Sequence, residues 1–250
     1  MANPLTSSNS LKKLNQTGRA NGQYRRIDRM PSLALIVVDP QNDFVEGGSL
    51  AVPGGIAVVS KINQLRLGLN NPAIFISQDW HPADHSSFAS NNPGSQVFPT
   101  VQLASGPQVM WPDHCVQRSD GANFVASLIT STADQIIQKG TQTAVDSYSA
   151  FGDATPGHSL EKTDLEERLR AQGIKTVVCC GLALDYCVSY TARDAAAAGF
   201  TTYLVLEACR GIAADSIEKE LGLMLEAGVI IVRSMTDLPT ELLVPVPGRG

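Results

Sequence analysis

Six short runs rich in valine and isoleucine limit most strongly what this 250-residue chain can fold into. Several are apolar throughout rather than alternating, which is typical of parallel strands buried on both faces. Helix-like stretches separate most of them, near residues 56–69, 164–172, 186–198 and 214–227. The alternation predicts an α/β fold, with a parallel sheet and crossover helices on both faces. The predicted strands are Leu33–Val38, Ala73–Ser77, Asp134–Gln138, Thr176–Cys180, Thr201–Leu206 and Val229–Val232.

The composition excludes several broad classes of protein. Hydrophobic residues make up 43% of the chain and charged residues 17%, which suits a globular domain with a sizeable core. No apolar run reaches the ~18 residues that a membrane span needs. The formal net charge of −5 argues against nucleic-acid binding by the protein as a whole. We therefore expect no membrane partner and no nucleic-acid partner.

The N-terminal segment differs in charge from the rest of the chain. Residues 1–30 hold six Lys or Arg against one acid, Asp28, and contain no apolar stretch of the kind found in secretory signals. We expect a basic, disordered extension over 1–31, a hydrolase-like domain over 32–240 and a short tail over 241–250. The five cysteines form no C-x-x-C pair, which favours reduced thiols in the cytoplasm. Mitochondrial targeting by the basic segment is the alternative.

One connection is unusually long. Residues 80–133 separate the second and third predicted strands and are rich in Pro, Gly, Ser and Asn. They contain three of the four histidines and both tryptophans. Connections of this length are uncommon in compact domains and are usually functional, so we favour a binding role over a plain surface insertion.

Chemically competent side chains follow four of the predicted strands, where ligands bind in open parallel sheets. Asp39, Lys139 and Cys187 follow the first, third and fourth strands. With Asp185 as its N-cap, a helix would place Cys187 in its first turn, where the positive helix end favours a thiolate. Separately, each residue has a simpler explanation: a turn cap, a solvated lysine, a buried thiol. Together they predict nucleophilic catalysis with a carboxylate, not a histidine, as proton shuttle.

A second group of residues has the chemistry of a metal site. Asp79 and His81 lie two residues apart after the second strand, and the long connection supplies His114. Two imidazoles and one carboxylate form an open site for Zn²⁺, Fe²⁺ or Mn²⁺, although such pairs also occur on surfaces. His85, four residues beyond His81, is expected to support the ligands from outside. His158 is expected at the surface.

Five segments together resemble the nicotinamidase (pyrazinamidase) branch of the isochorismatase-like cysteine hydrolases. The resemblance covers roughly residues 32–232. Two departures concern the pocket: Leu184 stands where a threonine is frequent, and Pro40 follows Asp39 where a larger side chain is usual. The matching segments are Val38–Phe44, Asp79–Pro82, Trp111–Cys115, Lys139–Gly140 and Asp185–Val188.

The resemblance implies a fold and a set of site residues. The fold is a three-layer, six-stranded parallel sheet of Rossmann-like topology. A cis peptide between Leu182 and Ala183 is implied, with the amides of Ala183 and Cys187 forming an oxyanion hole. The remaining implied roles are a catalytic triad of Asp39, Lys139 and Cys187, metal ligands Asp79, His81 and His114, most often for Zn²⁺, and ring-enclosing residues Phe44, Trp111 and Tyr186.

The same resemblance implies an activity. Such enzymes hydrolyse nicotinamide, and pyrazinamide, to the acid and ammonia through a cysteine thioester, a step of NAD salvage. Two alternatives stay open: a cysteine amidohydrolase acting on carbamoyl or ureido compounds, and a non-catalytic protein that uses Cys187 as a sensing thiol. Assembly into a homo-oligomer also stays open.

Overall fold

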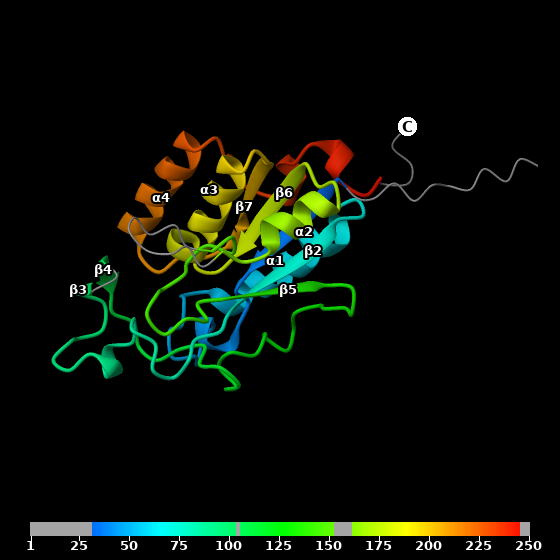
Figure 1. Ribbon diagram of the computed structural model, residues 1–250. Coiled ribbons are helices and arrows are strands. Elements are labelled where there is room, and N and C mark those ends of the chain that lie inside the picture. The colour runs from blue at the N-terminus through cyan, green and yellow to red at the C-terminus, as the bar shows by residue number, and fades with distance from the viewer. Residues whose placement is uncertain (1–31, 104–105, 153–161, 246–250) are drawn as a thin grey trace, which may run out of the picture.

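The structure is a computed structural model that describes residues 32–103, 106–152 and 162–245 (Figure 1). The predicted N-terminal extension and His158 lie outside the described residues, as does half of the predicted C-terminal tail, residues 246–250. Within the described part of the chain, no helix is long and apolar enough to cross a membrane.

A six-stranded parallel sheet forms the centre of the domain, as predicted. Its strand order is β5-β2-β1-β6-β7-β8. Each predicted strand is present, with ends that differ from the prediction by at most three residues. The strands are β1 (Leu33–Val38), β2 (Ala73–Asp79), β5 (Gln135–Lys139), β6 (Thr176–Gly181), β7 (Thr201–Cys209) and β8 (Ile230–Val232).

Helices cover both faces of this sheet. The chain leaves β1 toward β2 on one side, whereas β6 leads to β7 on the other. Since crossovers between parallel strands are right-handed, the helices on these two connections lie on opposite faces. The four α-helices are α1 (Gly55–Gly68), α2 (Leu165–Ala171), α3 (Ser189–Ala197) and α4 (Ala214–Glu226).

Strand β1 lies at the centre of the hydrophobic core. All six of its residues are buried, because it pairs with β2 on one edge and β6 on the other and is covered on both faces. Each fully buried aliphatic side chain of this kind contributes roughly 1.5–3 kcal/mol. The strand order reverses between β1 and β6, and this switch opens a crevice at their carboxyl ends. The polar residues predicted at the strand ends therefore meet in one place.

The long connection contains an element that the sequence did not predict. An antiparallel hairpin, β3 (Thr100–Leu103) and β4 (Gly106–Val109), stands apart from the main sheet at the left of Figure 1. Its strands are four residues long and include Gly106 and Pro107, so the local pattern resembles a loop. Short helical turns complete the fold: η1 (Asn42–Phe44), η2 (Ala89–Asn91), η3 (Leu184–Val188), η4 (Met235–Asp237) and η5 (Thr240–Leu242).

The end of β6 requires a glycine. Gly181 pairs with Val38 at a φ of +125°, and a Cβ placed there would lie 2.1 Å from the Val38 carbonyl oxygen. Gly181→Ala should therefore lower the free energy of unfolding by about 2 kcal/mol or more, measured by urea denaturation. Gly199→Ala is the matched control, because Gly199 also has a positive φ but a Cβ added there would meet no atom within 4 Å. Equal losses in the two variants would contradict this account of the close contact.

Candidate active site

A fully buried lysine lies at the centre of a polar cluster at the carboxyl end of the sheet. Lys139, the last residue of β5, is 1% exposed. Its Nζ lies 3.0 Å from Asp39 Oδ2 and 3.4 Å from Cys187 Sγ. It also donates hydrogen bonds to Asp79 Oδ1 and, at 3.0 Å, to the carbonyl oxygen of Ser147. The structure thus brings together the three predicted catalytic residues.

Asp39 is held in one orientation directly after β1. It adopts a positive φ of 45°, and its Oδ1 accepts a hydrogen bond of 2.6 Å from the Ser77 hydroxyl. Burial raises the pKa of Asp39 to about 6, although the charge of Lys139 acts to lower it. A carboxyl group with this pKa can both accept and return a proton near neutral pH. Ser77 was not predicted, since a serine inside an apolar strand gives no signal of its partner.

Cys187 lies in a wider turn than the sequence predicted. The residues Leu184–Val188 form one π-helical turn, and α3 begins only at Ser189. The peptide between Leu182 and Ala183 is cis, as the resemblance implied. The prediction that Asp185 caps the helix of Cys187 is wrong, because its side chain binds the start of α4 instead.

The surroundings of Cys187 disfavour its thiolate. Burial raises its pKa well above the ordinary value; Lys139 opposes this shift, whereas Asp39 and Asp79 add to it. A hydrogen bond with Asp39 contributes in the same direction. Burial and the two carboxylates therefore act against the thiolate that a helix N-terminus would favour. The geometry instead presents a thiol next to a base.

The predicted metal ligands also come together. One ligand atom from each of Asp79, His81 and His114 lies within 4.8 Å of the other two. The Nδ1 atoms of His81 and His114 lie 2.9 and 2.7 Å from the carbonyl oxygens of Gly140 and Pro112. With those hydrogen bonds made by Nδ1–H, each Nε2 keeps its lone pair for a metal. The donor set therefore fits a divalent cation.

The protonation states of His114 and Asp79 agree with that use, whereas His81 favours the imidazolium form. Burial lowers the pKa of His81, but the carboxylate of Asp79 outweighs burial and raises it, so a metal would have to displace that proton. Burial lowers the pKa of His114 to about 4, and the neighbouring His81 adds to the effect, so His114 is neutral at pH 7. Burial opposes ionisation of Asp79, but Lys139 and His81 outweigh it and hold the pKa of Asp79 below its usual range. A neutral imidazole and an ionised carboxylate are the forms that bind metals.

His85 lies against the ring of His81 without a hydrogen bond to it. The two ring centroids are 4.3 Å apart. Its Nδ1 lies 2.8 Å from Ser87 Oγ, and its Nε2 lies 3.2 Å from the carbonyl oxygen of Val145. A supporting role for His85 through packing stays a prediction.

Cys187 and the three predicted metal ligands line one small cavity with about 340 Å³ of empty space, part of it open to solvent. Trp111 and Tyr186 meet in its wall with ring centroids 4.9 Å apart at 84°. The sequence did not predict Tyr148, whose hydroxyl accepts a hydrogen bond of 3.1 Å from Trp111 Nε1. All the predicted ring-enclosing and oxyanion residues line the cavity, together with residues not predicted. The full lining is Phe44, Leu50, Asp79, His81, Trp111, His114, Asp146, Tyr148, Ala183, Tyr186, Cys187 and Ile212.

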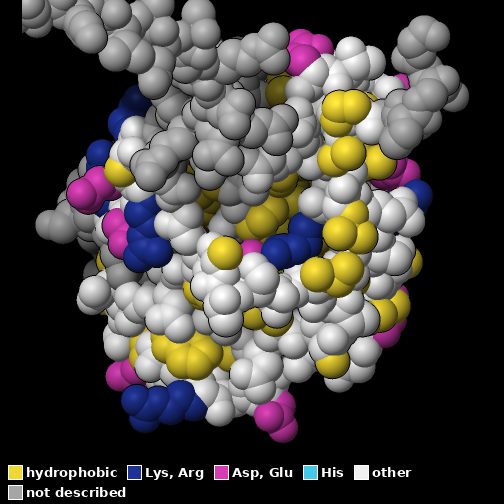
Figure 2. Space-filling view, turned by 90° about the vertical axis from the view of Figure 1, so that its right-hand side faces the viewer, with side chains coloured by type: hydrophobic (Ala, Val, Ile, Leu, Met, Phe, Trp, Pro, Cys, Tyr) yellow, Lys and Arg dark blue, Asp and Glu magenta, His cyan; other side chains and the backbone are white. Residues whose placement is uncertain are grey.

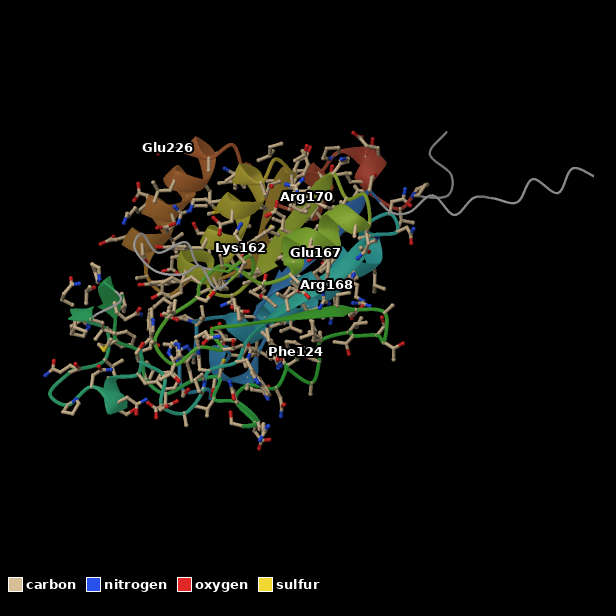
Figure 3. All side chains as sticks on the ribbon, in the orientation of Figure 1. Phe124, Lys162, Glu167, Arg168, Arg170 and Glu226 are labelled. Atoms are coloured by element: carbon tan, nitrogen blue, oxygen red, sulfur yellow. The ribbon has the colours of Figure 1, made fainter. Side chains whose placement is uncertain are left out.

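A larger hollow lies elsewhere and lacks this chemistry. It has about 1590 Å³ of open space beside α2, where Lys162, Glu167 and Arg170 line it (Figure 3). Among the described residues, the face in Figure 2 displays no histidine side chain, which agrees with the burial of His81 and His114. The cavity lined by Cys187 and the metal ligands is therefore the candidate active site.

Comparisons with known proteins point to one family. A family model described as the isochorismatase domain matches residues 33–236. The nicotinamidase of Acinetobacter baylyi is 45% identical over 214 residues, covering 85% of this chain and 98% of that protein. A solved nicotinamidase/pyrazinamidase structure from Acinetobacter baumanii is 41% identical with a TM-score of 0.77, covering 83% of this chain and 98% of its own. The pyrazinamidase of Pyrococcus horikoshii in complex with zinc is 37% identical with a TM-score of 0.66, covering 81% and 99%.

Proposed function

The chain belongs to the isochorismatase family, and within it we propose that the chain is a nicotinamidase, which hydrolyses nicotinamide to nicotinate and ammonia. One observation carries the proposal: Cys187 and the ligand group Asp79, His81 and His114 face the same small cavity. An amide at the sulfur and a ring nitrogen at the metal are the two features that nicotinamide joins in one molecule. The reaction returns nicotinamide to NAD synthesis, and pyrazinamide offers the same two features.

The first half of the reaction forms a thioester. Asp39 takes the thiol proton of Cys187, and the sulfur attacks the amide carbon. Lys139, 3.4 Å from the sulfur, stabilises the thiolate as the proton leaves. The negative charge that develops on the amide oxygen is held by the backbone N–H groups of Ala183 and Cys187, and one such donor contributes ~10²–10³ in rate.

The second half restores the enzyme. Protonated Asp39 gives its proton to the departing nitrogen, so that the C–N bond breaks and ammonia leaves. Asp39, again a carboxylate, then takes a proton from water as the water oxygen attacks the thioester carbon. The C–S bond breaks, nicotinate is released, and the proton on Asp39 returns to the Cys187 sulfur.

The aromatic residues of the cavity wall suit a planar ring. Phe44, Trp111 and Tyr186 line the cavity, and such side chains offer faces and edges on which an aromatic substrate can pack. A divalent ion held by Asp79, His81 and His114 would supply a Lewis-acidic centre for the pyridine nitrogen. Zinc is our first choice because nitrogen and oxygen ligands in an open site suit it, with Fe²⁺ or Mn²⁺ as alternatives.

Replacing the nucleophile should abolish the activity. We expect wild-type protein to release ammonia from nicotinamide and folded Cys187→Ala to release none above background, measured by a coupled ammonia assay. Cys180→Ala is the matched control, since Cys180 is equally buried in the neighbouring strand β6 but lies outside the cavity lining. Turnover by Cys187→Ala would refute the thioester, and faster ammonia release from carbamoyl compounds than from nicotinamide would favour the rival amidohydrolase.

Removing a metal ligand should weaken binding of the substrate ring while leaving the Cys187 thiol in place. His114→Ala should lose bound metal, measured by mass spectrometry of the metal content, and raise the KM for nicotinamide strongly. Benzamide has the same amide and shape but carbon in place of the ring nitrogen, so it should be a poor substrate of the metal-loaded enzyme. Comparable kcat/KM values for benzamide and nicotinamide would exclude the ring-anchoring role of the metal.

A further inference from the structure

The carboxylate of Asp185 joins the turn that carries Cys187 to the segment that begins α4. The Asp185 residue is only 2% exposed. Its Oδ1 accepts a hydrogen bond from the N–H of Ile212 at 2.9 Å. Its Oδ2 accepts from the N–H of Ala213 at 3.1 Å and from the hydroxyl of Ser216 at 2.5 Å. One side chain therefore satisfies three donors from a different part of the chain.

The backbones of the two segments are also in close contact. The N–H of Leu184 donates a hydrogen bond of 2.7 Å to the carbonyl oxygen of Arg210. Between them lies Gly211, where a Cβ would come within 2.8 Å of Asp185 Oδ1 and 2.6 Å of Ile217 Cγ1. The turn and the segment therefore pack too tightly to accept a side chain at residue 211 without moving.

The start of helix α4 has no side-chain acceptor of its own at the N-cap position. Its N-cap residue is Ala213, whose side chain has no hydrogen-bond acceptor. The N–H groups at the start of a helix lack intrahelical partners, and the helix dipole favours a negative charge there. Glu226, labelled in Figure 3, is the last residue of α4, so the bound end is the opposite one, which follows β7 in the chain. Asp185 places a negative charge at that end, where it binds the N–H of the N-cap residue Ala213 and the hydroxyl of Ser216 in the first turn.

The bonded segment also forms part of the cavity wall. Ile212, whose N–H is bound by Asp185, lines the cavity together with Cys187. Asp185 itself is two residues before Cys187 and is not among the lining residues. The carboxylate therefore fixes the attacking residue and a wall residue relative to each other without contacting the space that the substrate would occupy.

We infer that Asp185 is a positioning residue for the reaction of Cys187: its carboxylate clamps the nucleophile turn to the start of α4 and so fixes Cys187 against Ile212 across the cavity. The inference rests on the proposed role of Cys187 as nucleophile. A shift of about 1 Å at a reacting atom can cost ~10²-fold in rate, so a loosened turn should be visible in kcat.

The test compares Asp185→Ala with Asp134→Ala. Asp134 is the matched control because its carboxylate also accepts several hydrogen bonds, from Arg66 and Ser131, but precedes β5 at the end remote from Lys139. We expect the kcat for nicotinamide to fall ~10²-fold in Asp185→Ala and to stay close to the wild-type value in Asp134→Ala. Equal kcat losses in the two variants would overturn the inference, because any buried carboxylate would then serve equally.

A second readout separates positioning from loss of fold. Iodoacetamide labelling of each cysteine is followed by peptide mass spectrometry. In Asp185→Ala we expect Cys187 to be labelled several-fold faster than in wild type, while the other four cysteines, which are all buried, stay unlabelled. Labelling of all five together would overturn the inference, since Asp185 would then hold the whole fold rather than one turn.

A milder variant keeps the test decisive. Asp185→Asn retains the side-chain volume and one oxygen acceptor, so it should fold and show both changes to a smaller extent. Wild-type kcat and wild-type labelling in every Asp185 variant that folds would overturn the inference. Failure of the proposed function is distinguishable, because it would appear in the wild-type protein as no ammonia from nicotinamide, whereas the labelling comparison needs no substrate.

Discussion

The site depends on one interaction: the pairing of the buried Lys139 ammonium group with the carboxylates of Asp39 and Asp79. Burial lowers the pKa of Lys139, but the carboxylates of Asp39 and Asp79 outweigh burial and raise it, so the lysine stays charged. An unpaired charge at such a depth would cost several kcal/mol, and breaking a buried pair is strongly destabilising. One cation thus makes it possible for Asp39, Asp79 and the Cys187 thiol to share one buried space.

The charges of this cluster also connect the catalytic residues with the predicted metal ligands. With Asp79 ionised and Asp39 partly so near neutral pH, the carboxylates together carry more charge than Lys139 alone balances. That charge favours a second positive charge beside Asp79, which either a protonated His81 or a divalent cation between Asp79, His81 and His114 supplies. Because Lys139 binds one oxygen of Asp79, the other oxygen is available on the side of His81, whose Nε2 is 3.6 Å away. Proton transfer at the sulfur and ligand binding at the metal are therefore electrostatically coupled through one carboxylate.

Much of this could be predicted from sequence, because buried parallel strands have a strong apolar pattern and their carboxyl ends share one edge. That topology alone brings Asp39, Lys139 and the turn of Cys187 together. The metal ligands and the aromatic residues of the cavity were predicted from the five segments whose order and spacing resemble a known family. Neither source required any knowledge of side-chain contacts.

What the sequence did not predict depends on contacts between distant segments. The partners of Asp185 lie at the start of α4, so its role in joining the two segments could not be predicted from its neighbours in the sequence. The raised pKa of Cys187 follows from burial and from two carboxylates that follow other strands, and these contacts could not be predicted from its position in the chain. The β3–β4 hairpin is too short and too rich in Gly and Pro to give a strand pattern. Ile212 lines the cavity, but nothing in the sequence around it indicates this position.

The pH dependence of Cys187 alkylation in Lys139→Met tests the central role of the lysine most directly. Methionine keeps much of the side-chain volume and removes the charge, and the four other buried cysteines report whether the fold is intact. Since the cation acts to lower the thiol pKa, its removal should move the midpoint of iodoacetamide alkylation at Cys187 to higher pH. An alkylation profile identical to that of the wild type, with the other cysteines unlabelled, would show that Lys139 does not control the thiol and would contradict the account.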